Sequence, residues 1–512
     1  MNDKPRYRFW KIAVSVLLSL IGLMVLYLVL RVVWIRHSGH RQWEHTKADL
    51  LSRGEKLSLM DFVPATIPDE QNFFADPIWR ELNDFVEIEQ GGHRVKKSRI
   101  EEGKKQIDQF NAPLNKEEIA LLKKQFPEIQ WSKDNTTFRS IANSVVYSMD
   151  GQESRFDKKN KAEFLRTILS PLQPLLNHIA ELAKRPYAQY PVDYENNIRM
   201  NLRHISPLLQ CSQILRARAE ANLILGNSQS AFDDVMLMFH LEDTLKTEPV
   251  LISLLVRGAI IENILRVIDN GLKGHAWTNS NLADFEKQLS EYHLIHDLTF
   301  VIRAERGGFN DCIEGITKRA GAAKVIVTMV ESKEMPIHNK FSLEVISALY
   351  SEPDKAFYNR FIQQWVETLD VAPKKGLKEE SFFQEIREIR SHMVKYPYLL
   401  SQQALPGLIP CEVKMARRQD QVIQAQIACA LERYWLKNKL YPEALVQLTP
   451  DYIPTIPNDI VTLQPMRYRL IAPDQYQLWS IGWDHIDDDG KPATSWEQGD
   501  WVWGQWKLAR KY

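Results

Sequence analysis

The sequence has no excess of charge of either sign. Its 512 residues hold 65 lysines and arginines and 65 aspartates and glutamates, so the formal net charge is zero. No overall field therefore draws the chain to nucleic acid, and we expect no nucleic-acid partner. The charged fraction of 25% is ordinary for a globular protein and argues against long disordered segments.

Cysteine is scarce as well. The four cysteines are Cys211, Cys312, Cys411 and Cys429, and no two of them form a C-x-x-C pair. This spacing excludes a disulfide-dense scaffold and a cysteine zinc site. Two interpretations remain open, namely buried free thiols or one structural disulfide.

Familiar catalytic motifs are also missing. The chain has no glycine-rich phosphate loop, no G-x-S-x-G elbow and no H-E-x-x-H pair. His293 and His296 could share a helical face, but no third ligand follows nearby, so we expect surface or core roles for them. In "RAERGGFNDC", the residues Arg303, Glu305 and Arg306 predict ion pairs between helices, with a catalytic Glu305 as the alternative.

One long apolar run is present near the start of the chain. Residues 12–30, "IAVSVLLSLIGLMVLYLVL", carry no charge, and as a helix they span about 28 Å, close to the hydrocarbon thickness of a bilayer. The run continues into "RVVWIRHSGH", which offers no small-residue cleavage site. We therefore predict an uncleaved, single-pass signal anchor that contacts the lipid bilayer through residues 12–35.

Basic residues flank this run on both sides. Four precede it and three follow it: Lys4, Arg6, Arg8, Lys11, Arg31, Arg36 and Arg41. The positive-inside rule leans toward a cytoplasmic N-terminus. We therefore expect the bulk of the chain to be extracytoplasmic.

The sequence predicts a mainly α-helical protein in four consecutive segments. Residues 1–36 are the N-terminal tail and transmembrane anchor, and 37–112 are a juxtamembrane helix and a proline-rich extended strap. Residues 113–404 are an α-helical domain, and 405–512 are a long helix followed by a small α+β domain. Within the second segment, the charged stretch 85–112 predicts loops and a short helix.

A helical hairpin is predicted inside the α-helical domain. From about residue 161 to residue 318, apolar residues recur every three or four positions, and Gly226-Asn227 interrupts this pattern between two helices. Such a short turn favours an antiparallel pair of helices. Residues 248–272 are apolar nearly all round but contain charged side chains, so they predict a core helix and not a second membrane span.

The last part of the chain is predicted to be helical and then β. Helices are expected over 354–370, 377–402 and 411–440. Beyond them, polar and apolar residues alternate around Pro473-Asp474, which predicts a β-hairpin.

An acidic cluster lies close to the C-terminus, between aromatic residues. In "LWSIGWDHIDDDG", the carboxylates of Asp484, Asp487, Asp488 and Asp489 fall within six positions. Carboxylates brought so close together repel one another unless water or a cation separates them. Oxygen ligands on a flexible loop suit calcium, so an ion site is one interpretation and a solvated acidic turn is the other.

The stretch from residue 430 to residue 490 carries an ordered series of features. They are Leu431-Glu432-Arg433-Tyr434, Asn438, Tyr441-Pro442-Glu443, Leu448, Pro454, Pro457, Asp459, Pro465, Arg467-Tyr468-Arg469, Trp479-Ser480-Ile481-Gly482 and Asp484. In this order they resemble the C-terminal globular part of type II secretion major pseudopilins. They are more similar still to the pseudopilin-like tails of large membrane-anchored bacterial proteins of unassigned role. The resemblance implies a bacterial cell membrane location and a pseudopilin-like C-terminal domain.

The same resemblance implies a calcium site. In pseudopilins the loop after the corresponding strand binds calcium through aspartates and backbone carbonyls. By that resemblance the candidate calcium ligands are Asp484, Asp487, Asp488, Asp489 and Asp500. Lys439 and His485 depart from the family pattern, which has glycine at these positions. The chain also lacks the pseudopilin processing signal, so we do not expect a processed pilus subunit.

Three functions are compatible with these features. The first is a non-enzymatic, single-span envelope protein whose helical body and pseudopilin-like tail bind or scaffold another protein. The second is an extracytoplasmic hydrolase that uses paired carboxylates of the helical domain, which a pocket holding two carboxylates about 5–10 Å apart would favour. The third is an accessory component of a type II secretion-like system. We expect the first.

Overall fold

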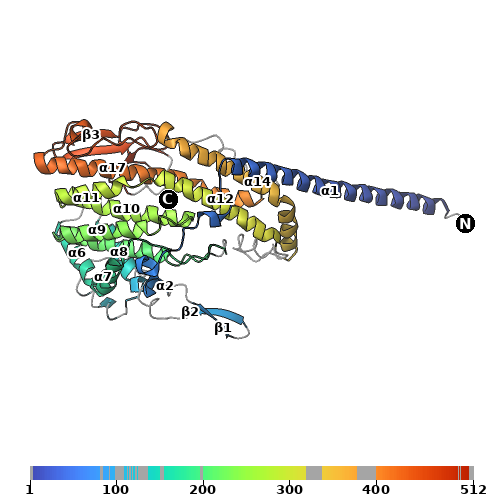
Figure 1. The fold of residues 1–512 in the computed structure, drawn as a ribbon, viewed down its shortest axis with the longest axis horizontal. Coiled ribbons are helices and arrows are strands. Elements are labelled where there is room, and N and C mark those ends of the chain that lie inside the picture. Colours follow the sequence, from blue (N-terminus) through green and yellow to red (C-terminus); the bar gives the residue numbers. More distant parts are fainter. Residues whose placement is uncertain are drawn as a thin grey trace. The chain divides into compact units, whose positions relative to one another are not determined.

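The chain is mainly helical over the residues that the structure describes (Figure 1). The structure is a computed structural model, and it describes residues 4–80, 85–90, 93–98, 109–111, 113, 114, 117, 119, 120, 124, 137–149, 155–195, 200–318, 337–377, 399–493, 495 and 498–506. The predicted helical class is thereby confirmed. The helix predicted over 377–402 lies mostly outside the described residues.

The secondary structure elements have the following bounds. The α-helices are α1 (Lys4–Ser52), α2 (Pro77–Arg80), α5 (Phe138–Met149), α6 (Arg155–Leu169), α7 (Gln173–Leu182), α8 (Ile205–Ile224), α9 (Ser228–Asp243), α10 (Leu251–Lys273), α11 (Asn279–Ser290), α12 (Leu294–Lys318), α14 (Ile337–Lys375), α16 (Leu399–Leu408) and α17 (Pro410–Asn438). The strands are β1 (Phe85–Gln90), β2 (His93–Ser98), β3 (Arg467–Ala472), β4 (Gln475–Ser480) and β5 (Trp501–Val502). Short 3-10 turns occur at Leu59–Phe62, Asp69–Gln71, Phe73–Ala75, Gln109–Asn111, Ser170–Leu172 and Leu445–Leu448.

The chain forms two compact units, each assembled from separate stretches of sequence. The anchor unit comprises Met1–Asp61, Arg306–Trp365 and Glu380–Ile409. The body unit comprises Phe62–Glu305, Val366–Glu379 and Pro410–Tyr512. The four predicted segments follow the chain in order, whereas each unit draws on several of them.

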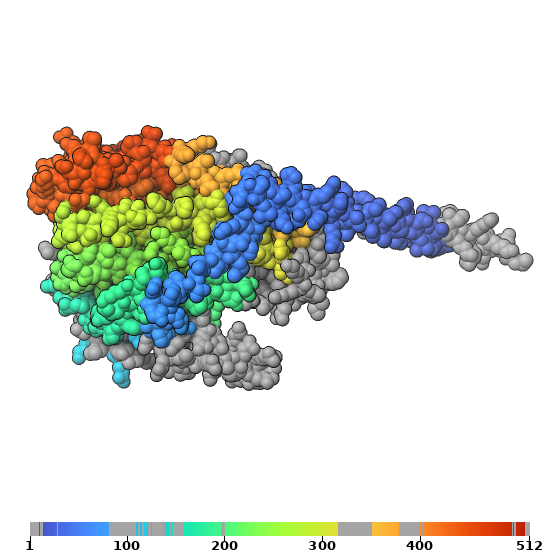
Figure 2. Space-filling view, viewed as in Figure 1, coloured from blue at the N-terminus to red at the C-terminus, as the bar shows by residue number. Residues whose placement is uncertain are grey.

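In the anchor unit, α1 is one uninterrupted helix from Lys4 to Ser52. The predicted juxtamembrane helix is therefore a continuation of the apolar helix and not a separate element. The described apolar side chains between Val14 and Trp34 are exposed along the rod visible in Figure 2. Among the described residues, α1 is the helix that is long and apolar enough to cross a membrane.

Just beyond this apolar run, α1 packs in parallel against α14. Gly39 lies so close to Pro353 that a Cβ atom at position 39 would come within 2.4 Å of the proline ring. Further along both helices, the Nζ atom of Lys355 lies 4.1 Å from the centre of the Trp43 ring. The two contacts advance in the same direction, so the helices are parallel. Glycine at position 39 is what permits their close approach.

In the body unit, α8 and α9 form the predicted antiparallel hairpin. Gly226 follows α8 with a φ of 82°, a left-handed conformation that glycine adopts without a Cβ clash. The small residues Ala217, Ala219 and Ala231 are buried, and α8 lies directly against α9. The short turn and the small side chains together allow the two helices to pack closely.

Helix α10 is the central helix of the body unit. It contacts α8, α9 and α17, and its apolar residues are buried on nearly every side. Its internal charges are paired, because Arg257 bonds Glu242 and Arg266 bonds Glu262. These observations confirm that the predicted helix over 248–272 belongs to a protein core.

The predicted extended strap follows α1 and joins the body unit. Its aromatic residues Phe73, Phe74 and Trp79 are fully buried. The backbone N–H of Phe73 donates to the carbonyl of Tyr187 at 2.8 Å. The strap is therefore an integral part of the body unit and not a loose linker.

The stretch after the strap differs from the prediction of loops and a short helix over 85–112. Its described residues include β1 and β2, which pair in antiparallel register from Phe85 with Ser98 to Gln90 with His93. The alternation of Val86-Glu87-Ile88-Glu89 in β1 is a strand signal in the sequence that the prediction of loops overlooked.

A three-stranded antiparallel sheet in the order β3-β4-β5 packs on α17. The strands β3 and β4 form the hairpin predicted around Pro473-Asp474. Leu478 on β4 packs into a buried cluster with Ile427 and Leu431 of α17. Strand β5 returns after a long loop and pairs with the end of β4, where Ser480 opposes Trp501.

The cysteine question is settled in favour of free thiols. All four cysteines are buried, and none forms a disulfide. Burial raises the pKa of the Cys211 thiol to about 12, although the nearby charge of Arg218 opposes the shift. This thiol is therefore protonated and unreactive at neutral pH.

A buried charge on α10 should destabilise the body unit. Leu254 and Ile260 are 1% and 0% exposed, so Leu254→Asp or Ile260→Asp would bury a carboxylate without a partner. We expect each to lower the free energy of unfolding by about 3–5 kcal/mol. The matched control is Ile252→Asp on the same helix, where the side chain is 45% exposed. Thermal melts of the full-length protein in detergent measure the effect, and equal midpoints for all three variants would contradict the core assignment.

Candidate functional site

The acidic loop connects β4 to β5 and lies against one face of the sheet. Arg467 and Arg469 stand two residues apart on β3, so their side chains project from the same face. Tyr468, between them, projects from the opposite face toward the α17 cluster. The alternation of the strand thus presents two positive charges to the acidic loop and an aromatic residue to the core.

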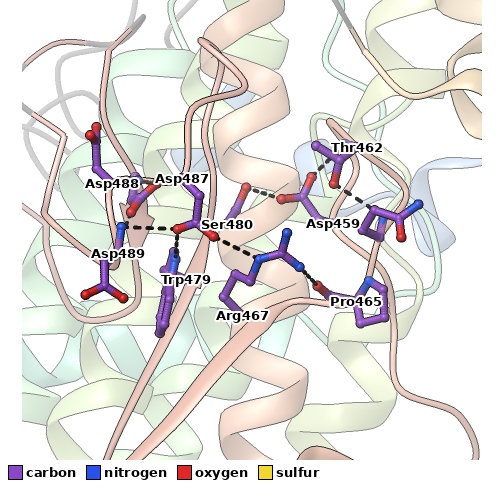
Figure 3. A network of polar contacts seen from close by, with 12 residues as sticks. Asp459, Thr462, Pro465, Arg467, Trp479, Ser480, Asp487, Asp488 and Asp489 are labelled. Carbon is purple, nitrogen blue, oxygen red and sulfur yellow. Dashed lines mark hydrogen bonds and ion pairs between the residues drawn. The ribbon is translucent and has the colours of Figure 1, made fainter.

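Two of the loop carboxylates are held by these arginines, and Figure 3 shows the contact between Arg467 and Asp487. Arg467 Nε lies 3.1 Å from an oxygen of Asp487, whose other oxygen accepts from Trp479 Nε1 at 3.1 Å. Arg469 Nη1 donates to Asp489 at 2.9 Å, and its guanidinium lies 5.2 Å from the centre of the Trp479 ring. The repulsion expected within the loop is therefore offset by arginine partners.

Two further carboxylates accept backbone N–H groups and fix the path of the loop. Asp484 accepts from Ile486 N–H at 3.1 Å and from Gly499 N–H at 2.8 Å. Asp500 is fully buried, and its two oxygens accept from Asp488 N–H at 3.3 Å and from Gly490 N–H at 2.7 Å. The backbone groups that these aspartates satisfy come from both ends of the loop.

Four of the five candidate calcium ligands have hydrogen-bond or ion-pair partners in this arrangement. Asp487 and Asp489 bond arginines, and the oxygens of Asp484 and Asp500 bond N–H donors. Asp488 is partly exposed, and its side chain makes no hydrogen bond or ion pair with another described residue. Within the described part of the chain, no group of three or more His, Cys, Asp or Glu side chains is placed to hold a metal ion. Calcium binding thus remains a prediction from the resemblance, and the geometry favours an arginine-held acidic turn.

Burial and hydrogen-bond partners also shift the pKa values of the loop carboxyls. Partial burial would raise the pKa of Asp487, but hydrogen bonds from Trp479 and Arg467 outweigh it and hold that pKa below its usual range. A carboxyl with a depressed pKa stabilises the fold above its unfolded-state pKa, and this contribution is lost as the pH falls. Burial raises the pKa of Asp500 and is only partly opposed by the N–H groups of Gly490 and Asp488.

A second carboxyl pair lies behind the sheet and was not singled out from the sequence as a site. Asp420 on α17 and Asp459 in the segment between α17 and β3 are both buried. Both contact Ser480 Oγ, at 2.9 Å and 2.5 Å, and Figure 3 draws the Asp459 contact. Asp459 had appeared only as part of the ordered series. No local signal marks Asp420, because it sits within a long amphipathic helix.

The charged residues of "RAERGGFNDC" have structural partners, as predicted. Arg303 pairs with Asp370 at 2.7 Å. In the anchor unit, Arg306 is fully buried and pairs with Glu55. Glu305 accepts the backbone N–H of Leu251 at 2.9 Å and so caps the first turn of α10. The capping role accounts for Glu305 without catalysis.

A polar pocket among the described residues of the body unit bears on the hydrolase interpretation. Its volume is about 370 Å³, and its lining includes Glu242, Asp243 and Glu291. Glu242 is the buried acid among them, and it accepts from Arg257 Nε at 2.6 Å and from Tyr292 Oη at 2.8 Å. Because that carboxylate is bound in an ion pair, the acids left for catalysis in this pocket are the exposed ones.

His293 and His296 are both exposed, which agrees with the surface role expected of them. His296 lies 3.9 Å from Asp297, at the limit of an ion pair. The pair of histidines therefore adds nothing to the candidate site.

The loop geometry predicts that substitution of Asp500 lowers the free energy of unfolding strongly and that substitution of Asp488 changes it little. Asp500→Asn removes an acceptor from a buried N–H group and should lower the free energy of unfolding by about 1–3 kcal/mol. Asp488→Asn should leave it unchanged or slightly raised, because that side chain has no partner among the described residues and adds to the repulsion on Asp500. Thermal melts of the full-length protein, with calcium and with a chelator, measure both effects. Equal midpoints in the two solutions agree with the arginine-held turn. A higher midpoint in calcium that Asp484→Asn abolishes would contradict it and establish the ion site.

Comparisons with known proteins place the chain in no family. A scan against protein-family models, a search among curated proteins and a search among solved structures each found no match. The pseudopilin resemblance of the C-terminal segment therefore stays a prediction.

Proposed function

We propose that this protein is a single-span protein of the bacterial cell membrane that acts as a non-enzymatic binding or scaffolding component for another protein. The observation that carries the proposal is the continuity of α1, which runs from the apolar segment into the packed anchor unit without a break. A helix of this kind fixes a folded unit at a membrane surface. The bulk of the chain lies on the extracytoplasmic side in this proposal.

The aromatic residues of α1 fit the width of a bilayer. Trp10 and Trp34 are 70% and 64% exposed, and along a straight helix they lie about 36 Å apart. The hydrocarbon core of a bilayer is about 30 Å thick, so both indoles would lie at the level of the headgroups, where tryptophan is enriched. Gly39, where packing against α14 begins, follows about 8 Å beyond Trp34. The anchor unit would then start at the membrane surface.

The C-terminal sheet supplies the best-supported binding surface. Strand β3 is at the edge of the order β3-β4-β5, so its outer backbone groups have no strand partner among the described residues. Ile471 on this strand is 53% exposed, and Val446 in the 3-10 turn Leu445–Leu448 is 70% exposed. An open edge with exposed apolar side chains suits the addition of an extended segment from another protein.

A type II secretion-like role is a narrower form of the same proposal. It draws support from the ordered series of residues and from the long helix followed by a small antiparallel sheet. In that form, the partner of β3 would be a true pseudopilin. A pseudopilin partner identified at this edge would favour the narrower form.

One experiment tests both the membrane anchor and the binding of another protein at the β3 edge. A photo-crosslinking amino acid is placed at position 471, or at position 252 as a control, since Ile252 is exposed on α10 in the body unit. After irradiation of cells, membranes are washed in alkaline carbonate. We expect both variants to remain in the membrane pellet, and only the variant at 471 to form a discrete adduct with another protein. Release into the wash would contradict the anchor, and equal adducts at both positions, or none at either, would contradict the binding edge.

A further inference from the structure

The carboxyl pair behind the sheet has an unbalanced set of hydrogen bonds. Asp420 and Asp459 both contact Ser480 Oγ, yet a hydroxyl group has only one proton to donate. Gly482 N–H, 3.3 Å from the same Oγ, fills one of its two acceptor positions. One acceptor position of Ser480 and one carboxyl oxygen therefore face each other without a proton between them if both acids are ionised.

A single added proton gives each of these hydrogen bonds one donor and one acceptor. If one carboxyl is protonated, it donates to Ser480 Oγ, and Ser480 donates to the other carboxylate. Asp459 is better placed to keep its charge, because its second oxygen accepts from Val461 N–H at 2.6 Å and from Thr462 N–H at 2.9 Å. The second oxygen of Asp420 accepts one such bond, from Ile460 N–H at 3.0 Å. Two hydrogen bonds stabilise an anion more than one does, so the proton belongs on Asp420.

We propose that Asp420 carries a proton that it donates to Ser480, so that a contact that weakens as the pH rises holds the C-terminal sheet on α17. We call this contact among Asp420, Ser480 and Asp459 the latch. The latch joins three separate parts of the body unit: α17, the loop that contains Asp459, and the end of β4. It does not depend on the proposed function.

The positive charges described on the elements around Asp420 are directed to other partners or to solvent. On α17, Arg418 is directed to Glu262, and Arg417 contacts the carbonyl of Gln505. The end of α14 lies next to the loop of Asp459, because Leu377 N–H donates to the carbonyl of Ile460. The lysines in that stretch, Lys374 and Lys375, are exposed to solvent. On the β5 side, Asp500 bonds the N–H groups of the acidic loop.

The electrostatics of the site agree with this assignment. Burial, and after it the charge of Asp459, raise the pKa of Asp420 well above its ordinary value, and the bonds from Ile460 and Ser480 oppose them only in part. A carboxyl whose folded-state pKa is raised stabilises the fold most at a pH below its unfolded-state pKa of about 3.9. That contribution declines as the pH rises toward the folded-state pKa. The latch is therefore strongest in acid and weakest in base.

Two isosteric variants test the latch. Asp420→Asn keeps a donor toward Ser480 and an acceptor toward Ile460, so it mimics the protonated acid at every pH. Asp459→Asn adds a second donor toward Ser480 and removes the charge that Val461 and Thr462 stabilise. Thermal midpoints of the full-length protein in detergent are measured between about pH 5 and pH 9, together with hydrogen exchange at residues 460–463.

We expect the wild-type midpoint to fall with rising pH more steeply than that of Asp420→Asn, which should match or exceed wild type at the basic end. Exchange at residues 460–463 should accelerate with pH in wild type beyond the intrinsic rate, and not in Asp420→Asn. Asp459→Asn should be less stable than wild type at every pH. Parallel pH profiles for wild type and Asp420→Asn would overturn the proposal. So would an Asp420→Asn protein that is as unstable as Asp459→Asn or fails to fold.

Discussion

The organisation of the body unit depends on the burial of α17 on nearly every side from Cys411 to Glu432. A helix in that position cannot direct its polar side chains to water, so each of them must find a partner on a surrounding element. The partners come from several different parts of the unit. Arg418 bonds Glu262 of α10, and Gln424 bonds the carbonyl of Trp501 on β5. Gln419 bonds the backbone of Tyr292 and Leu294, and Glu432 bonds His275 and Tyr441. These bonds fix the position of α17 along and around its own axis, which apolar contacts alone would leave less defined.

This constraint explains why the C-terminal sheet and the helical hairpins belong to one compact unit although more than a hundred residues separate them in the chain. The sheet packs its apolar face on one side of α17, while α10 and α11 pack on others. The acidic loop covers the outer face of the sheet and is held there by Arg467 and Arg469. Both faces of a small sheet are thereby occupied, and its β3 edge has no further strand partner among the described residues.

The sequence could predict the elements whose signals are local. The apolar run of α1, the glycine that ends α8, the nearly uniform apolarity of α10 and the alternation of β3 and β4 each lie within a few residues of the structure they specify. The calcium interpretation rested on the clustering of the loop aspartates and on the pseudopilin resemblance, and it remains a prediction. Its competitors, Arg467 and Arg469, were visible in the sequence, and their period-two spacing would have placed both on one face of a strand.

The latch could not be predicted in the same way. Asp420 and Ser480 are 60 positions apart, and Asp420 lies in a helix where an aspartate normally faces solvent. Only the three-dimensional arrangement brings it next to Asp459 and removes it from water. The strands β1 and β2 were missed for a different reason: the alternation of Val86-Glu87-Ile88-Glu89 is visible in the sequence, but the high charge of the stretch favoured loops.

The central claim is that α17 makes the helical hairpins and the C-terminal sheet one cooperative unit. Native-state hydrogen exchange on the full-length protein in detergent, with increasing denaturant, tests it most directly. The account predicts that the slowest amides of α10 and those of β4 share one opening free energy and one dependence on denaturant, as expected for a single unfolding event. Amides of β4 that open at a much lower free energy than those of α10, with a smaller dependence on denaturant, would contradict it.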